Sequence, residues 1–202
     1  MALTIYGFTP TRTRRVLWMA KELGLDFKSV QTTPGEGSRS PEHLKINPNG
    51  HIPAIDDDGV LMFESLAINL YLLKKHGGPL MPKTIVDEGL MGQWSFWAMT
   101  ELEPQVMPVL FGTIRPEATT PEAVAAAKER LPQVLKVLDG SLAGKDYLLG
   151  GGFSGADLNV ASVLSFLQMI KYDFSLSPNV AGWLDRCLGR PAFAAALAVK
   201  AS

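Results

Sequence analysis

Cysteine is almost absent from this 202-residue chain, which contains only Cys187. A single cysteine excludes an internal disulfide and argues against a cysteine zinc site. The three histidines, His43, His51 and His76, show no metal-ligand spacing with nearby carboxylates. We therefore expect no bound metal ion and a reducing compartment, the cytoplasm.

An excess of positive charge is also lacking, because 19 Lys and Arg face 20 Asp and Glu. This balance argues against a nucleic-acid partner. No uninterrupted apolar run approaches the ~20 residues that a membrane-spanning helix needs, and the N-terminal apolar stretch precedes the basic residues, the reverse of a signal peptide. With 47% hydrophobic residues, the composition is typical of a soluble protein with one large or two small domains.

The first eighty residues alternate between strand and helix patterns. A β-α-β order at the start predicts two parallel strands, and two short apolar runs around Asp58-Gly59 predict a β-hairpin. A final helix should end at Gly77-Gly78. Strands are expected over 3–8, 26–30 and 54–63, and helices over 11–24, 42–46 and 64–78.

Beyond about residue 85 the pattern is helical, with no convincing strand. Within it, Ser154 and Asp157 form a capping-box pattern, which is a folding signal and not a catalytic site. We predict a βαβ-α-ββ-α domain at 1–79, a linker at 80–84 and an all-helical domain at 85–202. The expected helices of the second domain cover 85–112, 121–143, 154–170, 178–188 and 191–199.

Four motifs in this order resemble the glutathione transferase superfamily. They are IYGFTPTRTRRVLWMAKELGLDF near the start, NPNGHIPAIDDDGVLMFESLAINLYL at 47–72, FSGADL at 153–158 and WLDRCLGRPAF at 183–193. The resemblance is to cytosolic, bacterial-like members with a Ser/Thr-type active site. It implies an α/β thioredoxin-like first domain with a mixed four-stranded sheet, an all-α second domain, glutathione as co-substrate and a homodimer.

The resemblance also implies the residues that bind glutathione. Pro53 should be cis, and the backbone N–H and C=O of Ile52 should pair with the cysteinyl part of the ligand as a short β-strand would. Ser65 should hold the γ-glutamyl carboxylate while Glu64 faces the amino group, and an N-cap role for Ser65 is compatible with this. His51 should face the glycyl carboxylate. The alternatives are that His51 is a solvated turn histidine, or that the nearby Lys45 or His43, which have weaker claims, makes this contact.

The catalytic group should be a hydroxyl at the start of the first helix, which stabilises the glutathione thiolate. Residues 9–13, TPTRT, contain no Ser or Cys. Aligning Arg15 with the basic residue four positions after the family's catalytic serine puts Thr11 in that role, with Thr9 and Thr13 as alternatives. A hydrogen bond of roughly 1.5–3 kcal/mol would lower the thiol pKa by about one to two units. Thr11 could instead be only an N-cap.

The remaining expectations concern a cation and the second substrate. Arg12 is expected to face an anionic part of glutathione. By resemblance, Trp97, Met107 and Phe111 line the pocket for the second substrate, although each could be ordinary core. The expected function is detoxification by conjugation of the glutathione thiolate to a small hydrophobic electrophile. The alternatives are glutathione-dependent reduction of disulfides or peroxides, and a non-catalytic interaction module.

Overall fold

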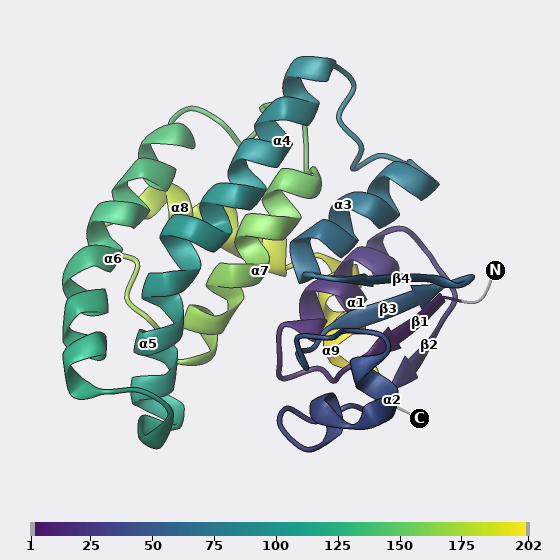
Figure 1. Ribbon diagram of the computed structural model, residues 1–202. Helices are drawn as coiled ribbons and strands as arrows, with labels where there is room; N and C mark the ends of the chain where they lie inside the picture. Colours follow the sequence, from purple (N-terminus) through teal and green to yellow (C-terminus); the bar gives the residue numbers. More distant parts are fainter. Residues whose placement is uncertain (1–2, 201–202) are drawn as a thin grey trace. The chain divides into compact units, whose positions relative to one another are not determined.

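The computed structural model describes residues 3–200, which divide into two compact units (Figure 1). The first unit contains the chain up to Met81 together with the segment from Gly189 onward, and the second spans Pro82–Leu188. From the sequence we expected residues 85–202 in one helical domain. The structure differs at the C-terminal end, where the chain returns to the first unit.

A mixed four-stranded sheet of order β2-β1-β3-β4 forms the centre of the first unit (Figure 1). The two strands of the β-α-β segment are parallel, and the hairpin strands are antiparallel. Asp58 and Gly59 both have positive φ, as a tight hairpin turn requires. The sheet predicted from the sequence is therefore confirmed. Its strands are β1 (Leu3–Tyr6), β2 (Phe27–Val30), β3 (Ala54–Asp57) and β4 (Val60–Phe63).

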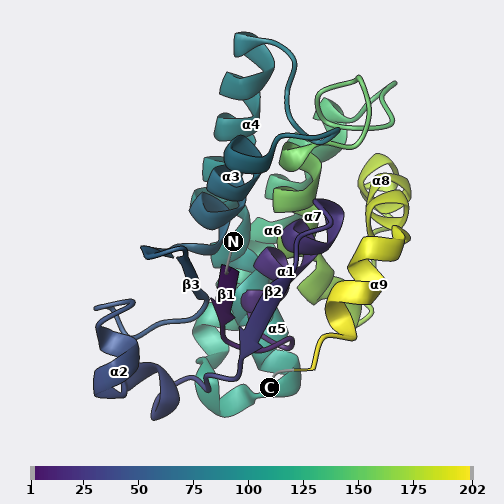
Figure 2. The same ribbon diagram turned by 90° about the vertical axis from the view of Figure 1, so that its right-hand side faces the viewer.

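Two helices of the first unit pack side by side on the sheet, where α1 contacts β1 and α3 contacts β3 and β4. Their apolar residues recur at helical spacing and are buried; Leu17 on α1 and Leu72 on α3 are fully inaccessible. The helix α9 packs against α1 (Figure 2). The helices of this unit are α1 (Thr13–Glu22), α2 (Pro41–Leu44), α3 (Ser65–His76) and α9 (Pro191–Leu197), with a 3-10 turn at Gly37–Arg39.

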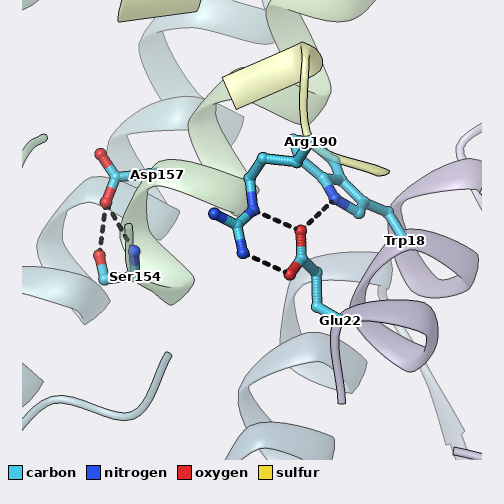
Figure 3. A network of polar contacts seen from close by, with 5 residues as sticks. All are labelled: Trp18, Glu22, Ser154, Asp157 and Arg190. Carbon is cyan, nitrogen blue, oxygen red and sulfur yellow. Dashed lines mark hydrogen bonds and ion pairs between the residues drawn. The ribbon is translucent and has the colours of Figure 1, made fainter. Parts of the chain in front are cut away.

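Polar and aromatic contacts explain why the last helix belongs to the first unit. Arg190 donates to both carboxylate oxygens of Glu22, at 2.6 and 2.8 Å, and Trp18 Nε1 donates to the same carboxylate at 3.0 Å (Figure 3). The rings of Trp18 and Phe193 meet edge to face with centroids 4.8 Å apart. A helical pattern in the sequence predicts the helix but does not say which unit it joins.

The second unit is all helical, and α7 is buried along most of its length. The single helix expected over 85–112 is interrupted by a π-helical segment, η2. Pro104 has no N–H to donate to the C=O of Thr100 inside that segment, so the α-helical hydrogen bond between these two residues cannot form. The helices are α4 (Ile85–Trp97), η2 (Ala98–Leu102), α5 (Glu103–Ile114), α6 (Pro121–Ser141), α7 (Gly155–Met169) and α8 (Pro178–Leu188), with a 3-10 turn at Pro116–Ala118.

The start of α7 is held by one buried carboxylate. Asp157 accepts from the N–H and hydroxyl of Ser154 (Figure 3), and also from the Leu148 N–H and Trp183 Nε1. Burial raises the pKa of Asp157, and these hydrogen bonds offset part of the increase. The predicted capping box is present, and both carboxylate oxygens are used within the fold.

Of the helices in the described chain, none is both long enough and apolar enough to span a bilayer.

Candidate active site

Three segments of the first unit meet at one end of the sheet. The strand register pairs Tyr6 of β1 with Ala54 of β3, and Ala54 with Phe63 of β4. Because β3 is antiparallel to both neighbours, the chain leaves β1, enters β3 and leaves β4 at the same end. These segments carry the three candidate threonines, the Ile-Pro pair and the Glu-Ser pair, so residues far apart in the sequence share one edge.

Ser65 is the first residue of α3 and is buried. The N-cap residue Glu64 makes no side-chain cap hydrogen bond, so the free N–H groups of the first turn are left without a side-chain acceptor there. The buried Arg15 of α1 donates from Nη1 to Ser65 Oγ at 3.2 Å. A hydroxyl that accepts this bond can still donate its own hydrogen to a ligand.

Arg15 was not predicted as a site residue; it served only to align the catalytic position. The structure shows that its guanidinium adds a positive charge directly beside Ser65 and the N-terminus of α3. Both features attract a carboxylate. One feature of the sequence could have indicated a binding role for Arg15. It is a cation in the first turn of a helix, where its charge opposes the helix dipole.

Glu64 adopts a backbone conformation that is unusual for a residue with a side chain. Its φ is 71° and its ψ is 107°. Such conformations cost of order 1–3 kcal/mol and gather at ligand-binding sites. The Glu64 side chain is exposed, so an amino group of a ligand can reach its carboxylate.

Ile52 lies two residues before the start of β3, and its peptide bond to Pro53 is cis. Within residues 3–200, neither the N–H nor the C=O of Ile52 has a hydrogen-bond partner. Ile52 is half-buried and Pro53 is buried. A partly enclosed donor and acceptor on one residue can pair with an extended peptide ligand.

The carbonyl of His51 accepts two hydrogen bonds from buried side chains. His43 Nε2 and Asn47 Nδ2 each lie 2.9 Å from it. The His51 side chain itself is exposed, as a contact with a glycyl carboxylate would require. His43 is a weaker candidate than His51 from the sequence, and the structure buries it with its ring packed edge to face against Tyr6.

The hydroxyls of Thr9 and Thr13, like that of Thr11, already lie within hydrogen-bond distance of other groups of the chain. Thr9 Oγ1 donates to the C=O of Val199 at 3.1 Å. Thr13 is fully buried, and a Cβ at Gly7 would clash with its hydroxyl. The glycine, with φ of +134°, makes room for this side chain. Neither threonine therefore presents its hydroxyl at the surface of the site.

Thr11 is half-buried in the turn before α1. Its hydroxyl lies 2.7 Å from the C=O of Phe8 and 2.9 Å from Thr13 Oγ1, and it accepts from the Thr13 N–H at 3.2 Å. To donate to a thiolate, the hydroxyl hydrogen must turn away from the Phe8 carbonyl. Arg12, the N-cap residue of α1, is exposed and supplies no side-chain cap.

The residues expected to line the second-substrate pocket lie in the helical unit. Met107 and Phe111 are one turn apart on α5 and half-buried, so they share a face of that helix. Trp97 ends α4, and its ring packs edge to face on Trp94 at 5.1 Å. The π-helical segment separates Trp97 from the α5 pair.

In the part of the chain that the structure describes, no cluster of three or more His, Cys, Asp or Glu could hold a metal ion.

Comparison with known proteins gives the family. The glutathione S-transferase N-terminal domain matches residues 1–74, and the glutathione S-transferase C-terminal domain matches residues 102–191. The chain belongs to the glutathione S-transferase family. Glutathione S-transferase 4 of Zea mays is 32% identical over 95% of this chain and 90% of its own length. Glutathione S-transferase F10 of Arabidopsis thaliana is 31% identical over 96% of this chain and 95% of its own.

Solved structures agree with this assignment to the glutathione S-transferases. The theta class enzyme from Xanthomonas axonopodis pv. citri, with glutathione bound, has a TM-score of 0.89 at 27% identity and covers 99% of both chains. A glutathione S-transferase-I bound with lactoylglutathione has a TM-score of 0.86 at 29% identity, over 97% of this chain and 98% of that one. The predicted superfamily, its fold and its enzyme class are thus confirmed.

Proposed function

We propose that this glutathione S-transferase conjugates the glutathione thiolate to a small hydrophobic electrophile. The observation that carries the proposal is the Tyr6, Ala54 and Phe63 register, which gathers three ligand-competent segments at one edge of the sheet. In this proposal glutathione lies along that edge, and no metal takes part.

Each part of glutathione has a chemically matched group. The γ-glutamyl carboxylate takes the Ser65 hydroxyl and the first-turn N–H groups of α3, beside the positive charge of Arg15. The amino group faces Glu64, and the cysteinyl part pairs with the N–H and C=O of Ile52. The exposed His51 faces the glycyl carboxylate.

The chemical step needs a thiolate near the start of α1. The thiol proton leaves to solvent, and the Thr11 hydroxyl and the helix N-terminus stabilise the sulfur anion. The sulfur lone pair then attacks an electrophilic carbon, forming a C–S bond while a leaving group departs or a conjugated double bond accepts the electron pair. Arg12 adds positive charge at the same helix end.

The second substrate and the assembly are also proposals. We assign Trp97, Met107 and Phe111 to contacts with an apolar electrophile, since they are aromatic or flexible and half-buried. A related enzyme from mais is in complex with an atrazine glutathione conjugate. Exposed apolar side chains at Ile85, Val86 and Phe96 of the second unit favour a homodimer that covers them. Detoxification in the cytoplasm completes the proposal.

The alternatives to conjugation are a glutathione-dependent reductase and a non-catalytic interaction module. Reduction of disulfides or peroxides by the bound thiolate would proceed without a protein mixed disulfide, because Cys187 is buried in α8 of the other unit. A non-catalytic interaction module would not need the unpartnered Ile52 N–H and C=O of the described chain. That pair, together with the uncapped α3, favours ligand binding.

Activity assays distinguish the three. With a chloronitrobenzene as the electrophile, conjugation should be saturable in glutathione and should exceed hydroperoxide or disulfide reduction. Reduction without conjugation would favour the reductase. Saturable glutathione binding without either activity would favour the interaction module.

A further inference from the structure

Two buried side chains converge on a single backbone carbonyl next to the cysteinyl subsite. His43 and Asn47 are 4% and 2% exposed, and both lie 2.9 Å from the C=O of His51. A carbonyl oxygen has two lone pairs and can accept both bonds. Since the carbonyl can only accept, His43 must carry its hydrogen on Nε2. Its Nδ1 has no partner among residues 3–200.

The held carbonyl belongs to the same peptide unit as the Ile52 N–H. In a trans peptide the C=O and N–H point in opposite directions. Two donors that fix the His51 carbonyl toward His43 and Asn47 therefore aim the Ile52 N–H away from them, where the described chain offers no acceptor. Hydrogen bonds to a carbonyl also polarise the attached N–H and strengthen it as a donor.

We propose that His43 and Asn47 are positioning residues that orient and polarise the His51–Ile52 peptide so that its N–H binds the cysteinyl carbonyl of glutathione. This rests on the proposed function, because it deepens the role of the same site. Neither side chain touches the ligand in this account; both act through the peptide unit. The Ile52 N–H, which has no acceptor in the described chain, adds no hydrogen bond to the fold, so folding alone does not explain its fixed direction.

The structure offers a nearly isosteric test. Asn47 Oδ1 accepts from the Asn49 N–H at 3.1 Å, while Nδ2 donates to His51. Asn47→Asp keeps the first bond and replaces the donor by an oxygen that repels the carbonyl. We expect glutathione to bind about tenfold more weakly or worse, with KM for glutathione raised more than kcat is lowered.

A second pair of variants changes His43, the other donor to the His51 carbonyl. His43→Phe removes the donor but keeps a ring against Tyr6, and should also weaken binding several-fold. His43→Gln carries an amide N–H that can reach the His51 carbonyl, so it should recover most of the affinity lost in His43→Phe. Glu42→Gln, an exposed change on the same short helix, is the matched control and should bind as the parent does.

Calorimetric titration with glutathione, alongside the thermal midpoint of each variant, decides the outcome. Weaker binding by folded Asn47→Asp and His43→Phe, with recovery in His43→Gln, supports the proposal. Unchanged affinity in both folded variants overturns it, even if their thermal midpoints fall. If Asn47→Asp does not fold, the His43 pair gives the decision. If the parent protein itself does not bind glutathione, the proposed function fails first, and the positioning role fails with it.

Discussion

The start of α3 in the first unit differs from the starts of α4, α6 and α7 in the second unit in how the free N–H groups are used. In the helical unit, Thr84 and Thr120 accept from the third residue of α4 and α6, and a full capping box closes α7. In the first unit, the N-cap residue of α3, Glu64, makes no side-chain cap hydrogen bond. The first arrangement stabilises a fold, whereas the second leaves donors for a ligand.

The contrast is clearest for two buried polar residues at helix starts. Asp157 receives four hydrogen bonds and so has no capacity to serve an external group. Ser65 receives one from Arg15 and keeps its own donor. Burial alone therefore does not separate a folding residue from a binding residue. What separates them is whether their hydrogen-bonding capacity is already used.

Removing the saturated carboxylate should have the largest effect. Asp157→Ala leaves the Trp183 Nε1, Leu148 N–H and Ser154 N–H as buried donors without an acceptor. We expect the free energy of unfolding to fall by about 3–5 kcal/mol. Denaturant unfolding measures this, with the exposed Asp146→Ala as control. A loss below about 1 kcal/mol would show that the α7 start is not held as described.

Removing the open hydroxyl should affect binding more than stability. Ser65→Ala deletes a donor to a charged carboxylate, which is worth roughly 1.5–3 kcal/mol, so glutathione should bind about ten- to a hundredfold more weakly. The control is Ser175→Ala, which changes an exposed serine in the other unit. Equal affinity in Ser65→Ala and the parent, measured by calorimetry, would remove Ser65 from the site.

The smallest expected effect concerns Asp57, a buried carboxylate of the first unit that accepts hydrogen bonds from two side chains of the fold. Burial raises the pKa of Asp57, but hydrogen bonds from Lys75 at 2.6 Å and Tyr71 at 2.9 Å outweigh it and leave the pKa lowered. A lowered folded-state pKa contributes stability above the unfolded pKa of about 3.9, which is lost as pH falls through the folded pKa.

The stability advantage over Asp57→Asn should therefore be present at neutral pH and shrink below about pH 4. Unfolding curves of both proteins from pH 7 to pH 3 test this. A constant difference across that range would mean that Asp57 is not stabilised as a carboxylate by Lys75 and Tyr71. Glutathione affinity at pH 7 should be unchanged, because this carboxylate is committed within the fold.

Local patterns were enough to predict most of the fold. Period-two and helical spacing located the strands and helices, and Ser154 with Asp157 predicted the start of α7. The return of α9 to the first unit was missed because it depends on the pairing of Glu22 with Arg190, 168 positions apart. The π-helical break was also missed, since Pro104 predicts a disturbed helix without specifying its form.

The candidate site was predictable where a motif carried it and not where tertiary contacts build it. Motif resemblance suggested Ile52, Glu64 and Ser65, which the strand register places at one edge. The Arg15 bond to Ser65 and the convergence of His43 and Asn47 on one carbonyl could not be predicted. They depend on side-chain directions that no local spacing encodes.

The most direct test of the account is an ultraviolet difference titration of bound glutathione, which follows thiolate absorbance against pH. An ordinary cysteine thiol has a pKa of about 8.5. The account predicts a bound thiol titrating about one to two units lower, with the shift largely lost in Thr11→Ala and kept in Thr11→Ser. Binding without any shift in the parent protein would contradict thiolate activation at the start of α1.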